Sequence, residues 1–212
     1  IDALKFVLKQ NGGFQNKTLQ EMDINKKLIT VTVHRRESFG KPLRNIIGAL
    51  TNIVTEYKDY NFVIPVHPNP NVSKFVIKTF KKFKNVILTK FLTYPDFIKL
   101  LNLSYLIITD SGGIQEEAPY LGKPVLVVRE ITERTEIEKL GGIKVIGREK
   151  DEIIKEFKNI IDPPSIYEKM AKVREPYGTG NASELIFKII KGGSKRGRHK
   201  SPSQRVGGLN IK

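Results

Sequence analysis

The fold is decided by the stretch Ile107-Ile108-Thr109-Asp110-Ser111-Gly112-Gly113-Ile114-Gln115-Glu116-Glu117-Ala118-Pro119. An apolar run of strand length ends in Ser-Gly-Gly, and a segment with two adjacent carboxylates follows at once. Gly and Ser punctuate regular structure, so we interpret the stretch as a buried strand that passes directly into a helix starting at Gly112.

The start of that helix is a candidate site for an anion. The first N–H groups of a helix have no partners within it, and the helix dipole favours negative charge there. Glu117 lies four residues after Gly113, on the same helix face, where a carboxylate can accept hydrogen bonds from both hydroxyls of a ribose. The pattern therefore indicates a nucleoside diphosphate. The alternative is that Ser111 is only the N-cap of an ordinary strand-to-helix turn.

Apolar runs and segments of helical period alternate along the rest of the chain. We expect strands near Leu28–Val33, Phe62–Val66, Val86–Leu88, Tyr105–Thr109, Val125–Val128 and Ile143–Ile146. We expect helices near Ile1–Leu8, Pro42–Tyr57, Val72–Phe80, Tyr94–Leu101, Gly113–Leu121, Asp151–Ile160, Ser165–Arg174 and Asn181–Ile190, and a polar linker over 11–25. Strands this apolar are buried on both faces. The sequence thus predicts an α/β fold with a doubly wound parallel sheet, whose ligands bind beyond the carboxyl ends of its strands.

The composition excludes several classes of site. The chain of 212 residues contains no Cys, so disulfides, thiolate metal sites and a cysteine nucleophile are excluded, and three His make a metal site an unfavourable reading. No apolar run approaches the ~18 residues of a membrane span, and the N-terminus lacks the order of a signal peptide. We therefore expect a cytoplasmic protein without a membrane partner.

The formal charge of +15 is partly concentrated at the C-terminus, where residues 192–212 hold six Lys or Arg and no acid. We predict a disordered basic tail there, which either binds polyanions through its charge or is an appended extension. The remaining positive charge lies on predicted helix faces, for example at Lys78, Lys81, Lys82 and Lys84. Lysines on such faces usually form solvent-exposed surface. Because no recognisable nucleic-acid module is visible, we expect no specific nucleic-acid partner.

Six motifs follow one another in a characteristic order. They are Thr32-Val33-His34-Arg35-Arg36-Glu37, Pro65-Val66-His67-Pro68-Asn69-Pro70-Asn71-Val72, Leu92-Thr93-Tyr94-x-x-Phe97, the stretch Thr109 to Pro119, Leu121-Gly122-Lys123-Pro124-Val125-Leu126-Val127-x-Arg129-x-x-Thr132-Glu133-Arg134, and Pro176-Tyr177-Gly178-x-Gly180-x-Ala182-Ser183. In this combination the chain resembles the non-hydrolysing UDP-N-acetylglucosamine 2-epimerases of bacteria and archaea. The resemblance covers about residues 1–190.

The resemblance implies the C-terminal half of a GT-B-type fold, which is built from two Rossmann-like domains. It divides the chain into a hinge helix and linker (1–27), a Rossmann-like UDP-binding domain (28–191) and the basic tail (192–212). The family's first domain is then expected outside this sequence or on a separate chain. The intact enzyme is expected to be a homodimer.

The resemblance also implies a role for each matching residue. Ser111, Gly112 and Gly113 would bind the diphosphate, and Glu117 would bind the ribose. Leu92, through its backbone, and Phe97 would bind the uracil. Arg134 would bind a phosphate or sugar oxygen, and His34, Arg35 and Glu37 would lie near the sugar. His34 is the candidate for proton transfer or substrate orientation, and His67 is expected to act indirectly or structurally.

Each of three roles has a structural alternative. Phe97 fits the core of an amphipathic helix, and His34 fits a hydrogen-bonding cap at a strand end. Arg134 has the spacing for a surface ion pair with Glu130 or Glu138.

The chain departs from the family at three positions. Ser38 stands where Asn is usual, Pro68 where Leu is common, and Thr135 where Pro usually follows the Arg. The first two are expected near the cleft, where they would affect substrate positioning.

In the family, UDP is eliminated from UDP-N-acetylglucosamine and added back to give UDP-N-acetylmannosamine, a precursor of cell-surface polysaccharides, without a cofactor or metal. The main acidic catalytic residues belong to the first domain, so this chain alone is expected to bind UDP without turnover. Two alternatives stay open. A non-catalytic remnant or subunit would bind UDP-sugars only, and a GT-B glycosyltransferase domain would transfer the sugar to an acceptor.

Overall fold

The computed structural model describes residues 1–10, 12–174 and 177–193. Most of the basic tail predicted over 192–212 lies outside the described residues. Only its first two residues are described, and they end the last helix rather than begin a tail.

Six parallel strands form one sheet: β1 (Leu28–Thr32), β2 (Asn61–Pro65), β3 (Val86–Thr89), β4 (Leu106–Thr109), β5 (Val125–Val127) and β6 (Ile143–Val145). Their order in the sheet is β3-β2-β1-β4-β5-β6, and each neighbouring pair is parallel. The predicted doubly wound, Rossmann-like sheet is confirmed. The order reverses between β1 and β4, so the crevice that such sheets use for ligands lies where these two strands end.

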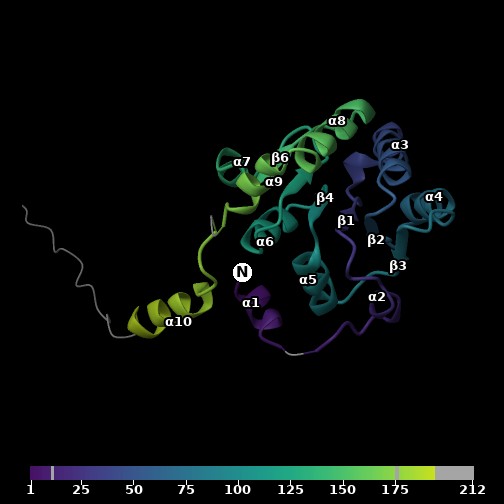
Figure 1. Ribbon diagram of the computed structural model, residues 1–212. Helices are drawn as coiled ribbons and strands as arrows, with labels where there is room; N and C mark the ends of the chain where they lie inside the picture. The colour runs from purple at the N-terminus through teal and green to yellow at the C-terminus, as the bar shows by residue number, and fades with distance from the viewer. Residues whose placement is uncertain (11, 175–176, 194–212) are drawn as a thin grey trace, which may run out of the picture.

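The helices connect the strands on both faces of the sheet. They are α1 (Asp2–Leu8), α2 (Lys17–Gln20), the 3-10 helix η1 (Arg36–Ser38), α3 (Lys41–Glu56), α4 (Pro70–Phe80), α5 (Tyr94–Leu103), α6 (Ile114–Tyr120), α7 (Thr135–Lys139), α8 (Lys150–Ile161), α9 (Pro164–Ala171) and α10 (Ala182–Gly193). In Figure 1, α3, α4 and α8 lie on one side of the strands, and α1, α5 and α6 lie on the other. No helix in the described part of the chain is long and apolar enough to cross a membrane.

Alternate residues of each inner strand enter different cores. Leu106 and Ile108 of β4 pack with α3, α4, α8 and α9, whereas Ile107 packs with α1, α5, α6 and α7. Successive side chains of a strand point to opposite faces, so an apolar run can supply both cores. The prediction that the strands are buried on both faces is confirmed for these central positions.

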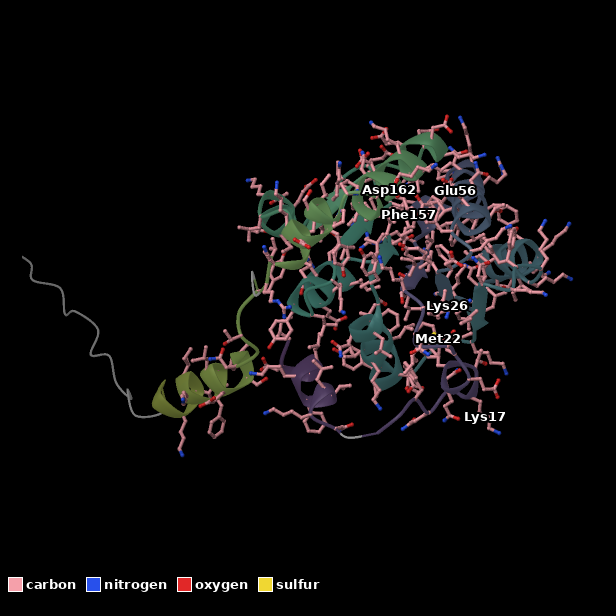
Figure 2. All side chains as sticks on the ribbon, viewed as in Figure 1. Lys17, Met22, Lys26, Glu56, Phe157 and Asp162 are labelled. Atoms are coloured by element: carbon pink, nitrogen blue, oxygen red, sulfur yellow. The ribbon has the colours of Figure 1, made fainter. Side chains whose placement is uncertain are left out.

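The structure corrects the predicted linker over 11–25. Residues 17–20 form α2, and Leu19 and Met22 are buried with Val63, Leu92 and Leu100. In Figure 2 the labelled Met22 lies toward the sheet, whereas the labelled Lys17 is at the outer edge of the molecule. The segment has few apolar residues, but Phe14, Leu19 and Met22 pack in one small core, whereas Ile24 is exposed. This segment therefore packs as part of the domain.

Two sets of hydrogen bonds hold this segment in place. The carboxylate of Asp96, at the start of α5, accepts hydrogen bonds from the backbone N–H groups of Gln15 and Asn16, each at 2.9 Å. The Asn16 side chain then caps α2 by accepting from the Leu19 N–H. Long-range bonds of this kind have no signature in hydrophobic periodicity.

At the other end of the chain, α10 lies apart from the sheet (Figure 1). It is tied to α1, because the Asp2 carboxylate accepts hydrogen bonds from the N–H groups of Ala182 and Ser183. The Lys5 ammonium also donates to the carbonyl of Thr179. The first and last described helices are thus joined at their N-termini.

Candidate functional site

A pocket of about 420 Å³ opens at the carboxyl ends of β1, β2 and β4. Its lining consists of Thr32, Val33, His34, Pro65, His67, Phe91, Leu92, Tyr94, Phe97, Ser111, Gly113, Ile114 and Glu117. Six of the residues expected to bind ligand are among them: His34, Leu92, Phe97, Ser111, Gly113 and Glu117. The structure thus brings together residues from three separate motifs.

The turn that connects β4 to α6 forms one wall of this pocket. The hydroxyl of Thr109 accepts a hydrogen bond from the Ser111 N–H at 3.0 Å and also bonds the hydroxyl of Thr32 at 2.7 Å. The carbonyl of Ser111 accepts from the Gln115 amide. The turn is therefore fixed to both strands of the switch point and to the helix that follows.

The N-cap of α6 is Gly113, and no side chain caps the helix. The helix begins at Ile114, two residues later than predicted, and the alternative that Ser111 is its N-cap is wrong. Among the described residues, nothing accepts a hydrogen bond from the N–H groups of Gly112, Gly113 and Ile114 or from the Ser111 hydroxyl. Unpaired donors beside a pocket are suited to an anion.

Asp110 fixes the loop after β1, which carries several of the expected residues. Its fully buried carboxylate accepts hydrogen bonds from the N–H groups of His34 (3.0 Å) and Arg35 (2.9 Å) and from the hydroxyl of Ser38 (3.0 Å). Ser38 is itself fully buried and does not line the pocket. At this departure from the family, the serine thus bonds a buried carboxylate.

His34 lies on the pocket wall, with its Nδ1 atom 3.7 Å from an Asp110 oxygen. Burial lowers the pKa of His34, the negative charge of Asp110 partly offsets that shift, and the charges of His67 and Arg35 lower the pKa further. A lowered pKa leaves the imidazole neutral at neutral pH, so it can accept a proton or a hydrogen bond.

His67 stacks on His34 with ring centroids 5.4 Å apart, and the exposed ring of Phe91 meets His67 edge-on. The His67 Nδ1 atom accepts a hydrogen bond from the Asn69 N–H, which fixes the loop between two prolines. This loop bond agrees with the structural role expected for His67. The residue also lines the pocket, however, and Phe91 does so without having been singled out in the sequence.

One end of the pocket is formed by the segment that leads into α5. Leu92 is buried in one small core with Leu19 and Val63, and it also lines the pocket. The half-buried Phe97 packs against two cores and also lines the pocket. For Phe97 the predicted place in the core is confirmed, and its position on the pocket wall leaves the predicted contact with a ligand possible as well.

The two adjacent carboxylates of α6 have different partners. Glu117 lines the pocket, and its Oε1 atom accepts a hydrogen bond from the hydroxyl of Tyr94 at 2.7 Å. Burial raises the pKa of Glu117, and the Tyr94 bond opposes that shift. Glu116 is paired with Arg134, whose Nε atom lies 2.5 Å from its Oε1 atom. Adjacent helical residues diverge by about 100°, which accounts for the separation.

Arg134, Arg35, Gly112 and Glu37 are the expected residues that do not line the pocket. The partner of Arg134 is Glu116, so the alternative that it pairs with Glu130 or Glu138 is wrong. The guanidinium of Arg35 lies against Gly112, since a methyl group added to this glycine would be 3.4 Å from Nη2. A fixed positive charge thus borders the turn with unpaired N–H groups.

Glu37 belongs to a network of charges beside the pocket. Its carboxylate accepts from Arg129 Nε at 3.1 Å and pairs with Arg148 at 3.3 Å. The buried Arg129 also donates two hydrogen bonds to Glu133, at 2.8 and 2.9 Å, which lower the pKa of Glu133 to about 2. Arg129, Arg148 and Glu133 had no role assigned from the sequence. Within the described ranges, no group of three or more His, Cys, Asp or Glu is arranged to hold a metal ion.

Comparison with known proteins gives consistent matches. The sequence model of a family described as UDP-N-acetylglucosamine 2-epimerase matches residues 1–191. The UDP-N-acetylglucosamine 2-epimerase of Campylobacter jejuni is 46% identical over 199 residues, which cover 90% of this chain and 52% of that protein. The corresponding protein of Escherichia coli O157:H7 is 45% identical over 190 residues, which cover 90% of this chain and 49% of that protein. The chain thus spans about half the length of the relatives it matches.

Solved structures agree with the sequence matches. The UDP-GlcNAc 2-epimerase of Neisseria meningitidis, bound to UDP-GlcNAc, is similar with a TM-score of 0.79 and 42% identity, covering 83% of this chain and 47% of that one. Staphylococcus aureus MnaA, in a structure with UDP, gives a TM-score of 0.84 and 39% identity, with 92% and 53% covered. The C-terminal domain of a group 1 glycosyl transferase from Francisella tularensis is similar with a TM-score of 0.55 and 16% identity, covering 75% of this chain and 89% of that one. This is a similarity of fold alone.

Proposed function

Because residues 1–191 match its sequence model, the chain belongs to the UDP-N-acetylglucosamine 2-epimerase family, and from that premise we propose that its pocket binds the UDP portion of UDP-N-acetylglucosamine. The observation that carries the proposal is a convergence of three complementary groups in one pocket. The N–H groups at the start of α6 are unpaired, the carboxylate of Glu117 lies one turn further on, and Phe97 lines the same pocket. Each suits one part of a uridine diphosphate.

In this proposal the diphosphate lies at the turn formed by Ser111, Gly112 and Gly113. The unpaired N–H groups and the Ser111 hydroxyl donate to phosphate oxygens, and the helix dipole and the guanidinium of Arg35 stabilise the negative charge. Arg134 is held by Glu116 and would have to leave it, at least in part, to reach a phosphate or sugar oxygen.

The nucleoside lies toward α5. Phe97 offers an aromatic face to the uracil, and the backbone of Leu92 offers polar groups to the edge of the base. Glu117 accepts hydrogen bonds from the two ribose hydroxyls. This assignment leaves His34, with Arg35 and Glu37 behind it, at the sugar side of the pocket.

The reaction proposed for the whole enzyme inverts C2 of the sugar. A base removes the C2 proton, the C–H electron pair forms a C1–C2 double bond, and the C1–O bond breaks with its electron pair passing to UDP. UDP then adds back to C1 while C2 is reprotonated on the opposite face. This chain contributes the site that stabilises the charge of departing UDP. Neutral His34 is the candidate here for orienting the substrate or moving a proton.

We propose that the acidic residues of the reaction are supplied by the part of the relatives that this chain does not cover. The family relationship likewise supports a homodimeric intact enzyme and, because the substrate is a nucleotide sugar, work in the cytoplasm. With the chain alone in deuterated water, we expect no deuterium at C2 of UDP-N-acetylglucosamine. Its appearance would mean that the proton-transfer groups lie within these 212 residues.

Gly113→Ala tests the binding proposal directly. Gly113 has an ordinary helical φ of −64°, and a methyl group there would meet no atom within 4 Å, so the variant should fold normally. The same methyl would stand in the path of a phosphate. We expect UDP, titrated by calorimetry, to bind the variant at least about tenfold more weakly, a loss of about 1.4 kcal/mol.

Gly13→Ala is the matched control, since its added methyl also meets nothing within 4 Å and the residue is outside the pocket. It should bind UDP like the wild type. Equal UDP affinity in the Gly113 variant and the control would remove the diphosphate from the start of α6.

A further inference from the structure

Tyr94 holds the carboxylate that faces the pocket. It is the first residue of α5, with Pro95 next, and its hydroxyl donates to Glu117 Oε1 on α6 at 2.7 Å. Within the described residues, it is the one hydrogen-bond donor to this carboxylate. Nothing in the sequence analysis assigned Tyr94 a role, because the contact joins positions 23 residues apart.

The geometry leaves most of the carboxylate available. A carboxylate accepts about four hydrogen bonds, so one bond from Tyr94 to Oε1 leaves the second lone pair of that atom and both of Oε2. The neighbouring Glu116 is drawn away by Arg134 and does not compete. Without a fixed partner, a glutamate side chain loses rotamer entropy when a ligand immobilises it. A partner already present in the free protein removes part of that cost.

We propose that Tyr94 is a positioning residue, whose hydroxyl orients the Glu117 carboxylate toward the ribose and so strengthens discrimination for a sugar with both hydroxyls. This inference rests on the proposed function. It predicts that the ribose-dependent part of the affinity comes from the Tyr94–Glu117 pair rather than from Glu117 alone.

The electrostatics of the pair agree with that role. Burial raises the pKa of Glu117, whereas the hydrogen bond from Tyr94 favours the ionised form that a ribose needs. The charge of Glu116 also raises this pKa. The other titratable groups on the pocket wall are His34 and His67. Burial and the carboxylate raise the pKa of Tyr94, so its hydroxyl remains a donor at neutral pH.

Tyr94→Phe keeps the ring and removes the hydroxyl. We expect its affinity for UDP to fall about three- to tenfold, while its affinity for 2′,3′-dideoxy-UDP is unchanged. Tyr57→Phe is the matched control, because Tyr57 also donates to a carboxylate, that of Asp162, and does not line the pocket. This control should bind both ligands like the wild type. Equal losses for both ligands in Tyr94→Phe would overturn the proposal.

A double variant tests whether Tyr94 acts through Glu117. If Tyr94 acts through Glu117, adding Tyr94→Phe to Glu117→Gln should cause no further loss of UDP affinity. Additive losses would mean that Tyr94 binds the ligand independently, and the proposal would be wrong.

A measurement on the free chain, without ligand, tests the role of Tyr94 independently of the proposed function. The pKa of the Glu117 carboxyl, followed by NMR in the free chain, should be higher in Tyr94→Phe than in the wild type, and an unchanged value would overturn the proposal. Failure of the wild type to bind UDP would instead refute the proposed function, while the NMR titration would still decide whether Tyr94 controls Glu117.

Discussion

Asp110 links the two strands of the switch point at the scale of a single residue. It follows β4, yet the hydrogen bonds that its carboxylate accepts come from the loop after β1, at His34, Arg35 and Ser38. A buried charge is tolerated only when donors surround it. Asp110 therefore determines where the His34 ring lies relative to the unpaired N–H groups of α6.

Asp110→Asn should weaken both the fold and this placement. The variant keeps the shape but loses the charge that its donors stabilise, so we expect the free energy of unfolding in urea to fall by about 1.5–3 kcal/mol. The pKa of His34, measured by NMR, should fall further, because the Asp110 charge now raises it. Asp59→Asn, on the exposed surface, should change neither quantity. An unaltered His34 pKa would contradict the proposed influence of Asp110.

At the scale of elements, α2 and the segment around it support the part of the pocket wall that contains Leu92. Leu19 is 1% exposed and packs in the same small core as Leu92, which lines the pocket. The hydrogen bonds from Gln15 and Asn16 to Asp96 join the segment to α5, which carries Tyr94 and Phe97. The segment therefore belongs structurally to the domain that forms the site.

Leu19→Ala measures that contribution. Truncating a fully buried leucine should lower the free energy of unfolding by about 2–5 kcal/mol, as read from urea denaturation. Ile24→Ala lies close by in sequence but at a side chain that is 70% exposed, so its effect should stay within about 0.5 kcal/mol. Equal stability of the two variants would mean that the segment behaves as the polar linker that the sequence predicts.

At the scale of the whole molecule, a network of charges joins the carboxyl ends of β1, β5 and β6. Arg129 follows β5 and is nearly fully buried, Glu37 lies in the loop after β1, and Arg148 follows β6. Glu133 completes the network through its two bonds from Arg129. These contacts hold three loops together beside the pocket.

The stability that Glu133 contributes should depend on pH. Its pKa in the folded chain is about 2, below the ordinary value of 4.5, so the unfolded chain binds more protons between these values. The contribution is present above about pH 4.5 and is lost as the pH falls toward about 2. In thermal unfolding, Glu133→Gln should be less stable than the wild type at neutral pH, and the difference should shrink through this range.

Glu136→Gln serves as the comparison, because Glu136 is exposed on α7 and forms no ion pair among the described residues. The thermal stability of this variant should differ little from that of the wild type at every pH. If the difference in thermal stability between Glu133→Gln and the wild type stayed constant from neutral to acid pH, the charge of Glu133 would not act through Arg129.

The sequence by itself determined the order of the elements and the turn and helix that border the pocket. All six strands were predicted within two residues of their ends, because an apolar run between polar turns is a local pattern that reports burial directly. The Ser-Gly-Gly turn with Glu117 one turn later indicated where an anion and a sugar would bind, since helix geometry fixes the face on which residues four apart lie. The doubly wound sheet followed from strands alternating with helices.

The tertiary structure alone decided the partners of the charged and aromatic groups. Glu116 pairs with Arg134 and Glu117 with Tyr94, Asp96 holds the segment before α2, and Arg129 joins loops that are far apart in sequence. Such contacts depend on distances between segments brought together by packing, and no local periodicity encodes them. The direction of each pKa shift has the same origin, because burial and neighbouring charges exist only once the chain has folded.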